Sequence, residues 1–230
     1  MSYNKLKTSS ELGQAVQSHL ESLGLHTPMV PSTLTEDEKI SKITESMVDV
    51  MTVLGLDLTD DSLQDTPHRV AKMFVREIFW GLDPEAFPKC TAVENKMTRG
   101  ASDTFVMEKG VTVNSTCEHH LLPILGGCSI AYVPGKTVLG LSKMNRIAEY
   151  FSKRPQVQER LTFQIKETLA FILGTQDVAV YIDAAHTCVS TRGVEDPGSS
   201  TVTLATGGVF SDPNSSARAE FLAIARTAAK

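Results

Sequence analysis

Two short segments of the sequence concentrate the side chains that can hold a metal ion. The first, Ser115–His120, places a thiol, a carboxylate and two imidazoles at consecutive positions. The second contains His186 and Cys188, which lie on one face if the segment is extended. Cys117, His120 and Cys188 together offer two thiolates and one imidazole, a soft ligand set that favours zinc over magnesium. Three protein ligands would leave the fourth position of zinc for water, which is the arrangement of catalytic sites.

Two other interpretations of these residues stay open. Buried cysteines are most often small packing residues, and pairs of histidines occur without a metal. Alternatively, His119 or His186 could complete a closed structural site, although structural zinc commonly uses two tight ligand pairs and His-x-Cys is not one of the usual spacings. The remaining cysteines, Cys90 and Cys128, have no nearby partner in the sequence, and we interpret them as packing residues.

If the three-ligand site forms, His119 and His186 remain beside the metal. Imidazoles titrate near neutral pH, with an unperturbed pKa of about 6.5, so this pair suits general acid and base catalysis on a metal-activated water. Either histidine could instead orient a ligand through a hydrogen bond. Glu118 lies between the candidate ligands and is interpreted as a local hydrogen-bond partner.

Basic residues near these segments could bind phosphate groups. They are Lys136, Lys143, Arg146 and Arg192. Ser142 is expected to cap a helix over residues 143–153, and the free N–H groups at a helix start attract anions. Taken singly, each cation is more often a solvated surface charge. Their position near the metal segments favours a phosphorylated substrate.

The composition is that of a globular protein with a mildly acidic total. The chain has 230 residues, of which 41% are hydrophobic, and 22 Lys+Arg against 27 Asp+Glu give a formal net charge of −5. This charge argues against a nucleic acid or an anionic membrane as a partner, so an anionic ligand must meet a local basic cluster. The polar N-terminus lacks the apolar core of a signal peptide, and no segment approaches a membrane span. The four widely spaced cysteines are unlike a disulfide scaffold, and we expect a cytoplasmic protein.

The elements that must position these residues begin with helices. One helix is expected near residues 10–23. Thr35 and Glu38 have the spacing of a capping box and precede apolar residues at intervals of three and four, which predicts a second helix. Thr66 is expected to cap a third helix, with Pro67 at its first helical position. The first third of the chain is therefore predicted to be helical.

Strand-length pieces with apolar or alternating patterns follow, at 104–107, 111–116, 129–133 and 178–182. Between them, one helix is expected over residues 143–153 and another from Pro155 to a stop at Gly174. Strands, then a helix pair, then further strands indicate an α+β sheet layered by helices, not a doubly wound parallel fold. We interpret residues 1–85 as an N-terminal helical arm and residues 86–230 as the catalytic domain.

Four motifs together closely resemble the GTP cyclohydrolase I family. They are Ser115–His120, Gly140–Arg146, Arg154–Thr162 and His186–Val189. The similarity covers roughly residues 35–230. It implies the tunnelling fold, an antiparallel sheet backed by helices whose copies join around a ring. Family members typically form homodecamers from two face-to-face pentamers, so the resemblance implies active sites between subunits.

The resemblance also implies a reaction and a set of roles. The family converts GTP and water to 7,8-dihydroneopterin triphosphate and formate, the entry step of folate and pterin synthesis. Carried over by position, the zinc ligands are Cys117, His120 and Cys188, and the proton-transfer pair is His119 and His186. The triphosphate and ribose contacts are Ser142, Lys143, Arg146 and Arg192, with Arg69 reaching in from a neighbouring subunit. The residues that read guanine are Gln158 and Glu159.

Some roles and functions stay open at this point. A carboxylate at position 159 can accept from guanine N1–H and the 2-amino group together, whereas adenine offers no matching donors. Glu159 could equally interact with the helix dipole alone, and Ser142 could relay protons near the ribose. A zinc hydrolase or deaminase for another nucleotide would lack the guanine-reading pair. A ring-forming scaffold with structural zinc would need a fourth protein ligand.

Overall fold

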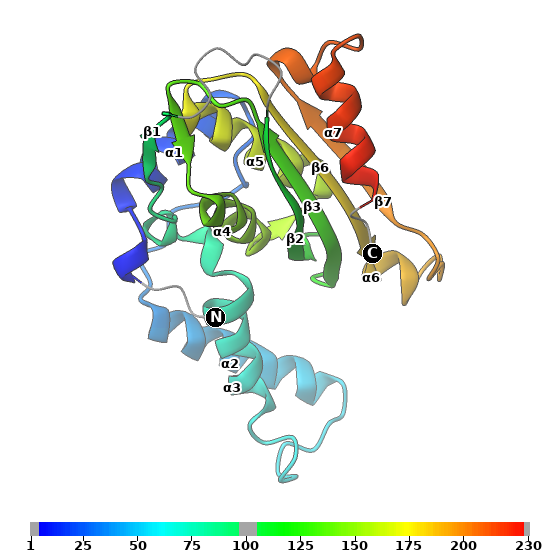
Figure 1. Cartoon of the computed structure of the whole chain (residues 1–230). Helices are drawn as coiled ribbons and strands as arrows, with labels where there is room; N and C mark the ends of the chain where they lie inside the picture. Colours follow the sequence, from blue (N-terminus) through cyan, green and yellow to red (C-terminus); the bar gives the residue numbers. More distant parts are fainter. Residues whose placement is uncertain (1–4, 97–104, 228–230) are drawn as a thin grey trace.

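The computed structural model describes residues 5–96 and 105–227, and its centre is a curved sheet (Figure 1). In the described residues this sheet has five strands in the order β5-β2-β3-β6-β7. Their bounds are β2 Val106–Cys117, β3 Pro123–Tyr132, β5 Pro155–Gln156, β6 Val178–His186 and β7 Thr201–Thr206. All neighbours are antiparallel except β5, which runs parallel to β2. The mixture of this sheet with helices confirms the α+β class.

The two faces of the sheet bury different cores because strand side chains alternate in direction. On β6, Val180 and Ile182 belong to the larger core, which also contains residues of α4 (Leu141–Ser152) and α5 (Gln158–Leu173). Tyr181 faces a smaller core formed with α7 (Ser216–Arg226). Figure 1 shows α7 on the side of the sheet opposite to α4 and α5.

The N-terminal helices form where the sequence predicts them, except that the N-cap of the third is Asp65 and not Thr66. They are α1 (Ser10–Ser22), α2 (Glu36–Val53) and α3 (Thr66–Met73). Both hydrogen bonds of the Thr35–Glu38 capping box are present at the start of α2. The packed pair α2 and α3 projects from the body, whereas α1 contacts α5 (Figure 1). The division of the chain at residue 85 stays a prediction.

Short elements complete the described chain. They are a π-helical turn at Phe74–Ile78, 3-10 turns at Lys5–Lys7, Trp80–Leu82, Pro84–Ala86 and Gly208–Phe210, the strand pair β1 (Ala92–Glu94) and β4 (Thr137–Leu139), and α6 (Thr187–Ser190). None of the helices in the described ranges has the length and apolar character that a membrane crossing requires.

The structure corrects two further helix starts. The N-cap of α4 is Gly140, which has no side chain to form a capping hydrogen bond. The prediction that Ser142 caps this helix is therefore wrong. The chain enters α4 two residues earlier because the Gly140 carbonyl accepts from the amide of Lys143 at 2.8 Å. Pro155 does not open α5 but lies in β5, where its backbone pairs with Thr116 at the sheet edge.

The strand predictions also need adjustment. The two pieces expected at 104–107 and 111–116 form one strand, β2, with a bulge between Glu108 and Val111. Gly110 adopts φ +70° there, a left-handed conformation that costs glycine little. Residue 104 lies outside the described ranges. Strand β7 was not among the expected strands, although it pairs with β6 along its whole length.

Candidate functional site

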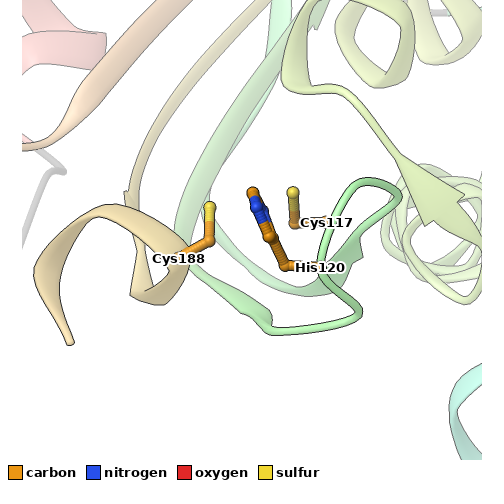
Figure 2. Close-up of side chains that lie close together, drawn as sticks. All are labelled: Cys117, His120 and Cys188. Carbon is orange, nitrogen blue, oxygen red and sulfur yellow. The ribbon is translucent and has the colours of Figure 1, made fainter. Parts of the chain in front are cut away.

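The three predicted metal ligands meet at one end of the sheet. Cys117 is the last residue of β2, His120 lies in the turn that follows, and Cys188 lies in α6 directly after β6. Strands β2 and β6 both run antiparallel to β3, which lies between them, so their C-terminal ends meet at the same edge. Figure 2 shows the His120 imidazole between the two thiols.

The local backbone directs this turn. Leu121 adopts φ +53° and its amide donates to the Cys117 carbonyl at 2.9 Å. The Cys117 amide donates to the Leu122 carbonyl at 2.8 Å, so the chain folds back sharply before β3 begins. The turn therefore presents Cys117 and His120 together.

The ligand atoms of Cys117, His120 and Cys188 all lie within 4.8 Å of one another. Cys117 is buried, with 4% of its surface exposed, while His120 is exposed. Burial is the main cause that raises the pKa of Cys188, and the neighbouring Cys117 raises it further through a hydrogen bond and through charge repulsion. A bound cation would relieve that repulsion, and two thiolates with one imidazole are a donor set that a metal ion of the zinc type prefers.

The two remaining histidines differ in their surroundings. His119 has 63% of its side chain exposed, and its Nδ1 lies 3.8 Å from the Cys117 sulfur. His186 is half-buried, and its Nε2 lies 2.8 Å from Oε1 of Gln158. Burial lowers the pKa of His186, and the negative charge of Glu159 partly offsets this effect.

The side-chain amide of Gln158 is engaged within the chain. Its Nε2 donates to the carbonyl oxygens of Ile182 (3.3 Å) and Thr201 (2.7 Å) and to the hydroxyl of Thr203 (3.0 Å). With its donors facing these acceptors, Oε1 is the atom that faces His186. A guanine-reading role for Gln158 stays a prediction, and the observed contact is with the histidine.

The predicted phosphate-binding residues lie in three places in the described chain. Lys143 and Arg146 lie on α4 close to Cys90. Burial raises the pKa of the Cys90 thiol to about 11, although the positive charges of Lys143 and Arg146 act to lower it. Arg192 follows α6, and its positive charge acts to lower the pKa of Cys188, which burial raises. Arg69 lies on the projecting helix α3, 3.4 Å from the carboxylate of Asp65.

Two charged residues beside the ligands have contacts that the sequence did not reveal. Arg160 in the first turn of α5 forms an ion pair with Glu118, which lies between Cys117 and His119. Only 14% of the Arg160 side chain is exposed. The two residues are 42 positions apart, so spacing along the chain carries no signal for this contact.

Comparisons with known proteins agree with the motifs. Residues 43–226 match the family model described as GTP cyclohydrolase I. A GTP cyclohydrolase 1 of Shewanella amazonensis is 53% identical over 213 residues, which cover 93% of this chain and 97% of that protein. GTP cyclohydrolase 1 proteins of Shewanella sp. strain ANA-3 and Vibrio parahaemolyticus are each 52% identical over 213 residues, covering 93% of this chain and 97% and 96% of those proteins.

Proposed function

Since the chain belongs to the GTP cyclohydrolase I family, we propose that it converts GTP and water to 7,8-dihydroneopterin triphosphate and formate at a zinc centre. Family membership makes the chain an enzyme with GTP cyclohydrolase activity, and the proposal adds the metal, the product and the residues. The observation that carries it is the convergence of Cys117, His120 and Cys188, whose ligand atoms lie within 4.8 Å of one another.

The proposed ligands fit a catalytic metal better than a structural one. Two thiolates and one imidazole hold zinc and leave one position for water. A zinc ion in this position would supply a water of lowered pKa as the nucleophile for carbon 8 of guanine. His119 and His186 are the candidates for a fourth protein ligand in the competing scaffold function. The hydrogen bond between His186 and Gln158 favours a separate role for that histidine.

His186 and His119 are proposed to move protons. Carbon 8 becomes a usable electrophile when guanine N7 is protonated, so the site needs an acid beside the metal. The oxygen of Gln158 accepts from Nε2 of His186, which leaves Nδ1 as the nitrogen that exchanges a proton. Ser142 in the first turn of α4 is the proposed relay to the ribose during its rearrangement.

Guanine recognition is assigned to the first turn of α5. Glu159 is a carboxylate whose charge reaches His186, so it belongs to the surroundings of the proposed proton donor. Its two oxygens can accept from N1–H and the 2-amino group of guanine together, which adenine cannot match. Gln158 is proposed to contribute to the same turn, through its contact with His186 or by direct contact with the base.

The triphosphate is proposed to lie against Lys143, Arg146 and Arg192. A chain with a net charge of −5 needs such a local cluster to attract a polyanion. The family relationship supports the tunnelling fold and a homodecamer with active sites between subunits, in which Arg69 on the projecting helix would reach the site of a neighbour. The pathway would be folate and pterin synthesis.

The product assay tests this proposal. Purified enzyme incubated with GTP should release formate and yield a fluorescent pterin after oxidation, and a chelator should stop both until zinc is restored. Consumption of GTP without formate would reject the proposed reaction in favour of another nucleotide hydrolase or deaminase. Full activity in metal-free enzyme would reject the zinc centre.

A further inference from the structure

Residues 117–120 contain two of the proposed zinc ligands, and we call them the metal-binding turn. The edge strand β5 fixes this turn on one side. Backbone pairing joins Cys117 to Gln156, and the Glu118 amide donates to the Gln156 carbonyl at 3.0 Å. Beyond Glu118 the chain turns away from β5, and His119 and His120 follow. A contact at the Glu118 side chain is therefore well placed to set where the turn leaves the sheet.

Arg160 makes that contact from α5. One terminal nitrogen donates both to the Glu118 carboxylate and to the Pro155 carbonyl, the latter at 3.2 Å. The Nε atom donates to Oε1 of Gln156 at 3.1 Å. The planar guanidinium therefore forms hydrogen bonds to β5 and to the metal-binding turn at the same time. The single ammonium group of lysine cannot form all of these hydrogen bonds.

The acceptor that Arg160 uses on Gln156 is itself held in place. Gln156 is fully buried, and its Nε2 donates to the Phe151 carbonyl at 2.9 Å and to Oε1 of Gln164 at 2.8 Å. The amide of Gln164 in turn donates to the Leu25 carbonyl at 2.7 Å. This series of hydrogen bonds fixes the orientation of the side-chain amides of Gln156 and Gln164. Oε1 of Gln156 must therefore face Arg160.

We propose that Arg160 is a positioning residue that holds the metal-binding turn against the start of α5 through its partly buried ion pair with Glu118. The inference rests on the proposed zinc ligands, because Cys117 and His120 flank Glu118. Buried ion pairs contribute little net stability, so the benefit lies in geometry. Arg160 also follows Glu159 directly, so one side chain links the turn that would hold zinc to the turn that would read guanine.

Variants of Arg160 test the proposal through zinc affinity and kinetics. Contacts that orient metal ligands typically change metal affinity or activity 10–100-fold when removed. We expect Arg160→Met to raise the zinc dissociation constant about tenfold or more and to lower kcat about tenfold, with KM for GTP within about twofold. The absorption bands of the cobalt-substituted protein should also shift, because they report the geometry around the thiolates.

Lys166 provides a matched control on the same helix. Its side chain is 6% exposed and its Nζ lies 2.8 Å from the carboxylate of Glu167, away from the ligands. Lys166→Met should lower the melting temperature and leave the zinc dissociation constant, the cobalt spectrum and kcat unchanged. If Arg160→Met does not fold, Arg160→Lys and Glu118→Gln serve instead, and both should shift zinc affinity in the same direction.

The outcomes separate this inference from the proposed zinc centre. If the wild type binds no zinc and turns over GTP in chelator, the proposed centre fails. If the wild type binds zinc and loses it in Cys188→Ala, the centre stands. Suppose that the folded Arg160 variants keep the zinc dissociation constant and the cobalt spectrum of the wild type and differ only by a lower melting temperature. That result would overturn the positioning role and leave the zinc centre in place.

Discussion

Oε1 of Gln158 lies 2.8 Å from Nε2 of His186, at the point where the start of α5 meets the end of β6. The amide nitrogen of Gln158 donates to acceptors on β6 and β7, so the oxygen must accept the imidazole N–H. This contact fixes the tautomer and the orientation of a histidine that we propose transfers protons. The relationship distinguishes two roles for Gln158, one acting on the histidine and one on the base.

Gln158→Met removes the contact with little change in volume. The buried carbonyl group of Ile182 loses this donor, which should lower the free energy of unfolding by about 1–3 kcal/mol. We expect kcat to fall about tenfold with a small change in KM, because His186 loses its orientation. Steady-state kinetics with GTP decide: a raised KM with wild-type kcat would show that Gln158 reads guanine instead.

Cys188→Ala should abolish metal binding and turnover together. The variant leaves one thiolate and one imidazole, too few protein ligands for tight zinc binding at a catalytic site. Metal analysis of the purified protein and the formate assay measure the two losses. Cys128→Ala, which changes a fully buried cysteine in the core, should keep stoichiometric metal. Retention of zinc and activity in Cys188→Ala would show that the ligand assignment is wrong.

Glu159→Gln separates guanine recognition from a helix-dipole role. As a carboxylate in the first turn of α5 it would contribute roughly 1 kcal/mol or less to stability. As the guanine reader, its loss should cost about 1.5–3 kcal/mol, roughly tenfold to over a hundredfold in kcat/KM for GTP. Thermal melts and kinetics of this variant decide between them. A lowered melting temperature with unchanged kcat/KM would assign Glu159 to the dipole.

We call Lys143, Arg146 and Arg192, the proposed contacts of the triphosphate, the triphosphate clamp. If these residues bind the triphosphate, guanosine should be a far poorer substrate than GTP. Hydrogen bonds to charged groups contribute about 1.5–3 kcal/mol each, so Arg146→Met or Arg192→Met should lower kcat/KM for GTP by roughly tenfold or more. Lys109→Met, at an exposed lysine in β2 whose Nζ donates to the Thr227 hydroxyl, is the control. Equal turnover of guanosine and GTP at matched concentration would reject the clamp.

The capping box of α2 predicts a pH dependence of stability. Hydrogen bonds from the backbone and side chain of Thr35 lower the pKa of Glu38 below its usual value near 4.5. The folded state therefore favours the carboxylate, and this stabilisation is present above that value and lost as the pH falls through the folded pKa. Glu38→Gln should melt below the wild type at pH 7, and the difference should shrink in acid. A constant difference between pH 7 and pH 3 would contradict the prediction.

Features that depend on neighbouring residues could be predicted from the sequence. The capping box at Thr35 and Glu38, the proline start of α3 and the stop of α5 at Gly174 each involve groups within about one helical turn. The meeting of Cys117, His120 and Cys188 was also predictable, because thiols and imidazoles are chemically distinctive and the motif around Cys117 is specific. Local chemistry leaves its mark on adjacent positions, so these predictions needed no knowledge of the fold.

The sequence did not determine contacts that join distant segments. Ser142 has a favourable side chain for a cap, yet Gly140 caps α4, and Pro155 serves the edge of the sheet instead of the helix that follows. The partners of Gln158 lie on β6 and β7, and Arg160 meets Glu118 across 42 positions. Many pairings of such residues are equally compatible with the local sequence. The tertiary structure decides among them because burial leaves each donor and acceptor only the partners that packing brings within reach.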